Sequence, residues 1–276
     1  MSHVDLVQAT VLGIVEGLTE FLPVSSTGHL TIVESLLNIP TDAKDVTAFT
    51  AVIQVGAILA AVVYFRRDII RLAVAFIRGL GSAPARREVD WRLALSVIAG
   101  SIPIGIVGFA ARNIIKNDLR SLWVVAVGLI VWSVVMVAAE RVATYRRHEA
   151  DTTLTDAVII GVVQCLALVP GVSRSGATIS AGLFRGLDRV AATRLSFLLG
   201  IPALVAAGAY ELKDLSGISV GPTILATVIS FVVGYVSIAW LLRFVVRHSI
   251  AVFAAYRVGL GVVVIGLLAT HVISAT

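Results

Sequence analysis

Charged residues are scarce in this chain of 276 residues: they make up 14%, whereas 58% of the residues are hydrophobic. This composition excludes an ordinary soluble domain and is typical of a membrane protein with several spans. The single cysteine, Cys165, excludes an internal disulfide. The formal net charge of +5 does not indicate a nucleic-acid partner, because the basic residues lie in short loops between apolar runs.

Six apolar runs are long enough to cross a bilayer as helices. They are 48–65, 93–111, 122–139, 196–210, 223–242 and 254–272. Four shorter apolar stretches come in two pairs, and each pair is interrupted by Pro, Gly and Ser: 4–22 with 29–37, and 157–169 with 177–187. Two half-length helices joined by such a turn indicate a re-entrant hairpin, which is tolerated at membrane depth only inside protein or beside a wet cavity.

One polar segment occurs twice in this apolar background, at 13–29 and at 161–177. A shift of 148 positions (164 − 16) aligns Glu16 with Gln164 without a gap. The differences that bear on chemistry are Glu20 against Leu168, Ser26 against Arg174, and His29 against Ala177. Polar groups are expensive in a membrane, so a duplicated polar segment is typical of a functional site.

The later spans also repeat, so that each half contains one hairpin and three spans. An odd number of crossings inverts the second half relative to the first. The sequence therefore predicts an all-α polytopic membrane protein, a single integral domain over 1–276, with inverted repeats at 1–147 and 148–276.

The arginine-rich loop at 66–92 predicts which side of the membrane each loop occupies. An excess of arginine marks cytoplasmic loops, so this loop is placed inside and both termini outside. The first hairpin then enters from outside and the second from inside. Their two polar turns are expected to meet near the middle of the bilayer.

Glu16 and Glu20 are four residues apart and share one helix face. Two carboxylates in a low-dielectric site need a cation, a shared proton or an arginine. A divalent cation that also binds phosphate oxygens fits, with Mg²⁺ or Ca²⁺ favoured by the oxygen ligands. The alternative is a polar pair that lines a water-filled cavity.

The segment that follows these carboxylates offers hydroxyl groups and an imidazole. Ser25 and Thr27 are candidates either to cap the next helix or to contact phosphate, beside Gly28. Ser26 is a candidate nucleophile with His29 as its base, and direct attack by water is equally consistent with the spacing. His29 is otherwise an ordinary histidine in the first turn of a helix.

Arg174 is the cation of the second copy. An arginine at the bilayer centre costs about 2.5–3.5 kcal/mol on the insertion scale, and its fork matches a phosphate. The alternative is a structural ion pair with Glu16 or Glu20. Gln54, inside the first span, is interpreted as an interhelical hydrogen-bonding residue.

The segments Glu16–His29 and Pro170–Thr178 resemble the motifs of the undecaprenyl-diphosphate phosphatase family, the bacitracin-resistance proteins of bacteria. The resemblance implies a plasma-membrane enzyme that removes the terminal phosphate of a prenyl diphosphate and recycles the lipid carrier for peptidoglycan synthesis. It also implies a divalent cation and a site that opens to the outer face. The implied partners are the prenyl diphosphate and membrane lipids, and a homodimer is left open.

Carried over by motif, the resemblance implies catalytic roles for Glu16, Glu20, Ser26, His29 and Arg174, with the metal on Glu16 and Glu20. The predicted substrate-binding residues around them are Ser25, Thr27, Gly28, Ser173, Ser175, Gly176 and Thr178.

Two other classes of function remain open. Inverted repeats with broken helices also occur in secondary transporters, so the same pocket could move an anion or flip a lipid phosphate. A lipid-binding scaffold explains the apolar spans but gives no role to the intramembrane carboxylates and arginine.

Overall fold

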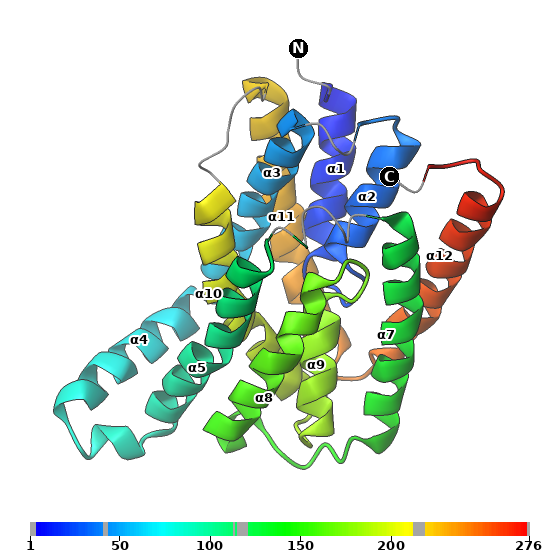
Figure 1. Ribbon diagram of the computed structural model, residues 1–276. Helices are drawn as coiled ribbons and strands as arrows, with labels where there is room; N and C mark the ends of the chain where they lie inside the picture. The colour runs from blue at the N-terminus through cyan, green and yellow to red at the C-terminus, as the bar shows by residue number, and fades with distance from the viewer. Residues whose placement is uncertain (1–3, 41–43, 113, 115–120, 212–218, 275–276) are drawn as a thin grey trace.

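The computed structural model describes residues 4–40, 44–112, 114, 121–211 and 219–274. Within these ranges the named elements are eleven α-helices and three short 3₁₀ helices (Figure 1). The first half contains α1 (Leu6–Thr19), α2 (Ser26–Leu36), α3 (Lys44–Tyr64), α4 (Arg66–Gly81), η1 (Ala85–Arg87), α5 (Val89–Ala110) and α7 (Leu122–Val142). The second contains η2 (Glu149–Asp151), α8 (Leu154–Gln164), η3 (Cys165–Leu168), α9 (Arg174–Phe184), α10 (Arg189–Glu211), α11 (Val220–Phe244) and α12 (Ala251–Ala269).

Six of the described helices are long and apolar enough to span a membrane, which confirms the six predicted spans. They are α3, α5, α7, α10, α11 and α12. The fourth span is longer than expected: α10 begins at Arg189 and continues through Pro202. Its first turns are polar, so the apolar pattern alone places the start too late.

The arginine-rich segment that was expected to be a loop contains a helix, α4. Its buried residues are Leu72, Ala75 and Gly79, and its Phe76 ring stacks on Trp91 at the start of α5, with ring centroids 5.4 Å apart. The arginines were interpreted as an orientation signal for the membrane. Because they interrupt the apolar residues in the sequence, the apolar face of this helix was missed. Figure 1 shows α4 and α5 as a helical pair at one side of the bundle.

Each predicted hairpin is present, and its second helix begins three residues earlier than expected, at Ser26 in α2 and at Arg174 in α9. The caps are Ser25 and Ser173. Their hydroxyl oxygens accept hydrogen bonds from the backbone N–H groups of Gly28 and Gly176, respectively. Both caps have a left-handed backbone, with φ of 78° and 76°. This conformation costs a non-glycine residue about 1–3 kcal/mol. The same distortion therefore occurs at both aligned serines.

The first helix of each hairpin packs tightly against a span of the other half, α1 on α11 and α8 on α5. A Cβ atom at Gly13 would lie 2.6 Å from the carbonyl oxygen of Ala226, and one at Gly161 would lie 2.1 Å from that of Gly100. Only glycine permits such an approach. Gly13 and Gly161 are aligned in the predicted repeat; the inversion of the halves and the boundary at 147 stay predictions.

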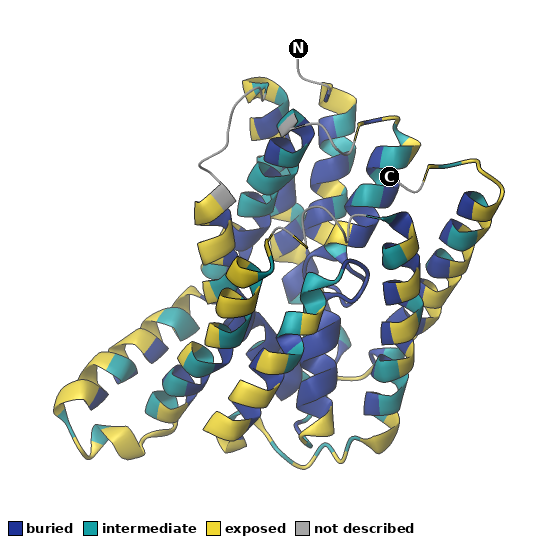
Figure 2. Ribbon diagram, viewed as in Figure 1, coloured by how far each residue is buried: buried dark blue, intermediate teal, exposed yellow. Residues whose placement is uncertain are grey.

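The core of the molecule surrounds α9, which Figure 2 shows as almost entirely buried. Every residue from Ser175 to Leu183 is buried. Most of these residues are small, which lets α7, α8 and α10 approach the helix closely. The second hairpin is therefore held rigidly at the centre of the bundle.

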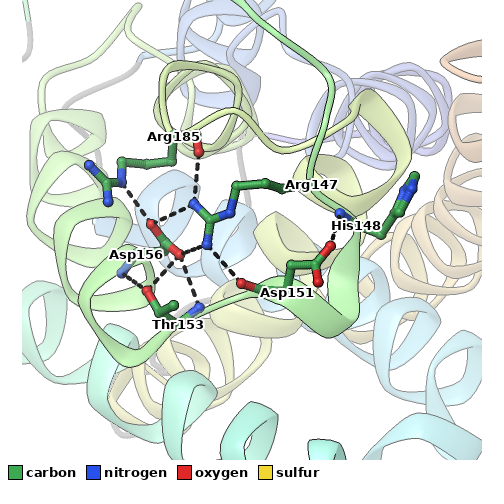
Figure 3. A network of polar contacts seen from close by, with 6 residues as sticks. All are labelled: Arg147, His148, Asp151, Thr153, Asp156 and Arg185. Atoms are coloured by element: carbon green, nitrogen blue, oxygen red, sulfur yellow. Dashed lines mark hydrogen bonds and ion pairs between the residues drawn. The ribbon is translucent and has the colours of Figure 1, made fainter.

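A network of ion pairs fixes the end of the second hairpin that lies away from its polar turn (Figure 3). Asp156 at the start of α8 is fully buried and accepts hydrogen bonds from Arg147 and Arg185. Burial raises the pKa of the Asp156 carboxyl, but hydrogen bonds from Arg147 and Thr153 outweigh it and hold this pKa well below its ordinary value. Arg147 also donates to the carbonyl of Arg185, which ties both ends of the hairpin together.

Candidate active site

The two polar turns meet, as their placement in the sequence predicts. The backbone N–H of Gly171 donates to Ser25 Oγ at 3.2 Å. The hydroxyl of Ser175 donates to the carbonyl oxygen of Leu22 at 3.0 Å. Segments 146 and 153 residues apart in the chain therefore form one polar cluster.

Glu20 is the centre of this cluster. Ser26 Oγ donates to one carboxylate oxygen at 2.6 Å, and Arg174 Nη2 donates to the other at 3.2 Å. The side chains of Glu20 and Arg174 are only 5% and 11% exposed. Three of the five predicted catalytic residues are thus in direct contact, and the ion pair that was one interpretation of Arg174 is present.

Arg174 keeps donor capacity beyond this ion pair. Its Nε atom is buried without a hydrogen-bond partner among the described residues, and Nη1 makes only a long contact of 3.4 Å with the carbonyl of Ser196. Gly200 on α10 leaves room for the guanidinium, because a Cβ there would lie 1.9 Å from Nη1. A guanidinium with an unused buried N–H can donate a hydrogen bond to a phosphate oxygen.

Both ring nitrogens of His29 have partners other than Ser26. Its Nδ1 lies 2.8 Å from the carbonyl oxygen of Ser25, and its Nε2 lies 2.7 Å from the hydroxyl of Tyr256 on α12. A carbonyl only accepts, so Nδ1 carries the proton, and in the neutral ring Nε2 accepts from Tyr256. The hydroxyl of Ser26 donates to Glu20, so this geometry favours Glu20 over His29 as the acceptor of the serine proton.

A cavity of about 180 Å³ lies beside the cluster. Its lining includes Glu16, Ser26 and Thr27, which were predicted, and Gln54, which was interpreted as an interhelical residue. The other lining residues are Leu30, Thr31, Glu34, Thr47, Thr50, Ala51, Val125 and Pro170. On α2 the lining positions recur every three to four residues, as one helix face requires, so this face could have been found from the sequence.

The remaining predicted residues of the second turn make hydrogen bonds inside the protein. Ser173 and Ser175 contact each other through their hydroxyl oxygens at 3.2 Å. Thr178 donates to the carbonyl of Arg174 and contacts the hydroxyl of Ser196. These bonds fix the first turn of α9, from which Arg174 projects. Their direct contact with substrate, like that of Gly28 and Gly176, stays a prediction.

The described residues contain no group of three or more His, Cys, Asp or Glu side chains that could hold a metal ion. Glu16 and Glu20 are both buried and lie one helical turn apart. Mg²⁺ commonly uses one or two carboxylates and completes its shell with substrate phosphates and water. The donors present therefore fit a cation that binds together with a phosphate substrate.

These features define a multi-pass helical membrane protein with a polar cavity beside two joined hairpins. Residues 9–263 match the family model described as bacitracin resistance protein BacA, and the chain belongs to this family. It is 60% identical to the undecaprenyl-diphosphatase of Acidothermus cellulolyticus, over 98% of this chain and 99% of that protein. It is 56% identical to undecaprenyl-diphosphatase 3 of Frankia casuarinae and 55% identical to undecaprenyl-diphosphatase 1 of Streptomyces avermitilis, each over 99% of this chain and 100% of the relative.

Proposed function

We propose that this protein hydrolyses undecaprenyl diphosphate to undecaprenyl phosphate and inorganic phosphate. The reaction recycles the lipid carrier for peptidoglycan synthesis and confers resistance to bacitracin. The contact of Glu20 with both Ser26 and Arg174, beside the cavity, is the observation that carries the proposal. The names of the relatives, which match along nearly the whole chain, support the same activity.

Substrate binding begins with charge neutralisation. The diphosphate enters the cavity while the prenyl tail stays in the surrounding lipid. Arg174 exchanges its ion pair with Glu20 for phosphate oxygens and adds its unpaired Nε donor. The N-terminus of α2 favours the same anion, because the first N–H groups of a helix point out of it and carry partial positive charge. Phosphoryl transfer depends mainly on such positioning and charge stabilisation.

Release of Glu20 from Arg174 leaves its carboxylate free to accept a proton. The hydroxyl of Ser26 already donates to it at 2.6 Å, so Ser26 loses its proton to Glu20 as its oxygen attacks the terminal phosphorus. The bond from this phosphorus to the bridging oxygen breaks, and undecaprenyl phosphate leaves. Water then hydrolyses the phosphoserine. In the alternative path a water molecule in the cavity attacks directly, and Glu20 takes its proton.

A divalent cation, Mg²⁺ or Ca²⁺, would be held by Glu16 and Glu20 and would neutralise charge on the phosphate oxygens. His29, which was predicted as the base for Ser26, is left to orient the first turn of α2, because Glu20 takes the serine proton. Tyr256 and the carbonyl of Ser25 hold its ring in one orientation.

The protein is proposed to lie in the plasma membrane with its cavity open to the outer face. Thr47 and Glu34 line the cavity next to the connection between α2 and α3, which the arginine distribution assigns to the outside. Hydrolysis would then occur where the lipid carrier has delivered its cargo.

The test is phosphate release from undecaprenyl diphosphate by purified protein in detergent with Mg²⁺. Wild type is expected to turn over, and Arg174→Ala is expected to lose at least about 100-fold in kcat, as for the loss of one oxyanion donor. Ser26→Ala distinguishes the two attacking groups, because it abolishes turnover only if the serine is the nucleophile. Binding of the diphosphate by wild type without phosphate release would contradict the proposal and favour transport.

A further inference from the structure

Arg257 lies in the second turn of α12, and its side chain is completely buried. It is the largest side chain in the described structure that is shielded from solvent to this degree. A charge in this position is costly unless its donors are satisfied. Its hydrogen-bond partners therefore reveal what it does.

The guanidinium of Arg257 bonds to both polar turns at once. Nη1 donates to the carbonyl oxygen of Pro23 at 3.0 Å. Nη2 donates to the carbonyl oxygens of Gly171 and Val172, at 2.7 Å and 3.1 Å. Nε donates to the hydroxyl of Ser133 on α7 at 3.2 Å, which fixes the plane of the guanidinium group.

These carbonyls belong to the residues that lead directly into the catalytic groups. Pro23 lies two residues before the capping serine of α2, and Val172 lies directly before that of α9. Both capping serines have strained, left-handed backbones that persist only when their surroundings hold them. Arg257 supplies such support to both turns from a single rigid group.

We infer that Arg257 is a positioning residue for the proposed reaction. It holds the turn that carries Ser26 against the turn that carries Arg174, so that both side chains reach one diphosphate. All the hydrogen-bond partners of Arg257 in the described chain are uncharged oxygens, so it contributes geometry rather than an ion pair. This inference rests on the proposed function, because positioning has meaning only where the two turns act on one substrate.

The experiment compares Arg257→Met and Arg257→Lys with wild type in the phosphate-release assay, with kcat expressed per folded protein. Thermal unfolding and size-exclusion chromatography measure the folded fraction at the assay temperature. Arg247→Met is the matched control, because Arg247 is exposed in the connection between α11 and α12.

Arg257→Met is expected to lose about 100-fold in kcat, since a shift of about 1 Å in reacting groups costs that much. Arg257→Lys keeps the charge, but its single nitrogen cannot span both turns, so we expect about a tenfold loss in kcat with KM within threefold. Arg247→Met is expected to match wild type.

Several results would overturn the inference. One is an Arg257→Lys variant that is folded and has the kcat of wild type. Another is a fall in activity that disappears when the rate is expressed per folded protein, because Arg257 would then act on stability alone. If wild type itself releases no phosphate, the proposed function fails instead, so the two failures are distinguishable.

Discussion

Replacing Gly200 by alanine tests the placement of Arg174 without touching a charged group. A Cβ at this position on α10 would lie 1.9 Å from Nη1 of Arg174 and 2.7 Å from its Cζ. Ordinary contact begins at 3.4 Å, so the terminal nitrogen must retreat by about 1.5 Å. The atoms in the way belong to the end of a flexible side chain. The guanidinium therefore moves and the helix does not.

The expected cost falls on catalysis rather than on stability. A displacement of about 1 Å at a catalytic group costs about 100-fold in rate, so Gly200→Ala should lose at least about that much in kcat/KM. Its thermal midpoint should stay near that of wild type. Alanine favours a helix by about 1 kcal/mol over glycine, and this gain offsets the cost of moving the Arg174 side chain.

Gly105→Ala on α5 is the matched control for this prediction, because a Cβ there meets no atom within 4 Å. It should keep full activity in the same phosphate-release assay. A Gly200→Ala protein with a kcat/KM within threefold of wild type would refute the placement of Arg174 described here.

Three further predictions concern groups around the site and at the base of the second hairpin. Tyr256→Phe removes one hydrogen bond to His29, worth about 1 kcal/mol, so kcat/KM should fall about fivefold; an unchanged value would show that this contact has no catalytic effect. Asp156→Asn should lower the free energy of unfolding by about 2 kcal/mol in denaturant titrations, less than for fully buried ion pairs because its two arginine partners are 29% and 39% exposed. The pKa of Asp156 in the folded protein lies below its ordinary value, so the ionised carboxyl stabilises the fold fully when the pH is above that ordinary value. The difference in unfolding free energy between wild type and Asp156→Asn should therefore shrink as the pH falls below about 4. EDTA should abolish phosphate release and Mg²⁺ should restore it, whereas full activity in excess EDTA would argue against a cation on Glu16 and Glu20.

The sequence predicted the elements of this fold because each has a local signal. Long apolar runs mark the six spans, and the duplicated polar segment marks the two hairpins. The meeting of the turns followed from the predicted topology, in which two hairpins that enter from opposite sides are expected to converge. The contact between Glu20 and Arg174 was accordingly one of the predicted ion pairs.

The groups that the sequence did not predict depend on contacts between distant segments. Tyr256 lies 227 positions from His29, and nothing in the apolar pattern of α12 indicates that its polar residues face the site. The pairing of Ser26 with Glu20 was missed for a different reason. Spacing along α2 suggests His29 as the partner of Ser26, whereas the left-handed backbone of Ser25 turns α2 back toward the end of α1.

The central claim is that the turn carrying Ser26 and the turn carrying Arg174 bind the same diphosphate. The most direct measurement is kcat/KM for phosphate release by wild type, Glu20→Gln, Arg174→Lys and the double variant. Residues that act on the same substrate group show strongly non-additive losses. We predict that the double variant is impaired little more than the worse single variant. Losses in the double variant equal to the product of the two single losses would contradict a shared site.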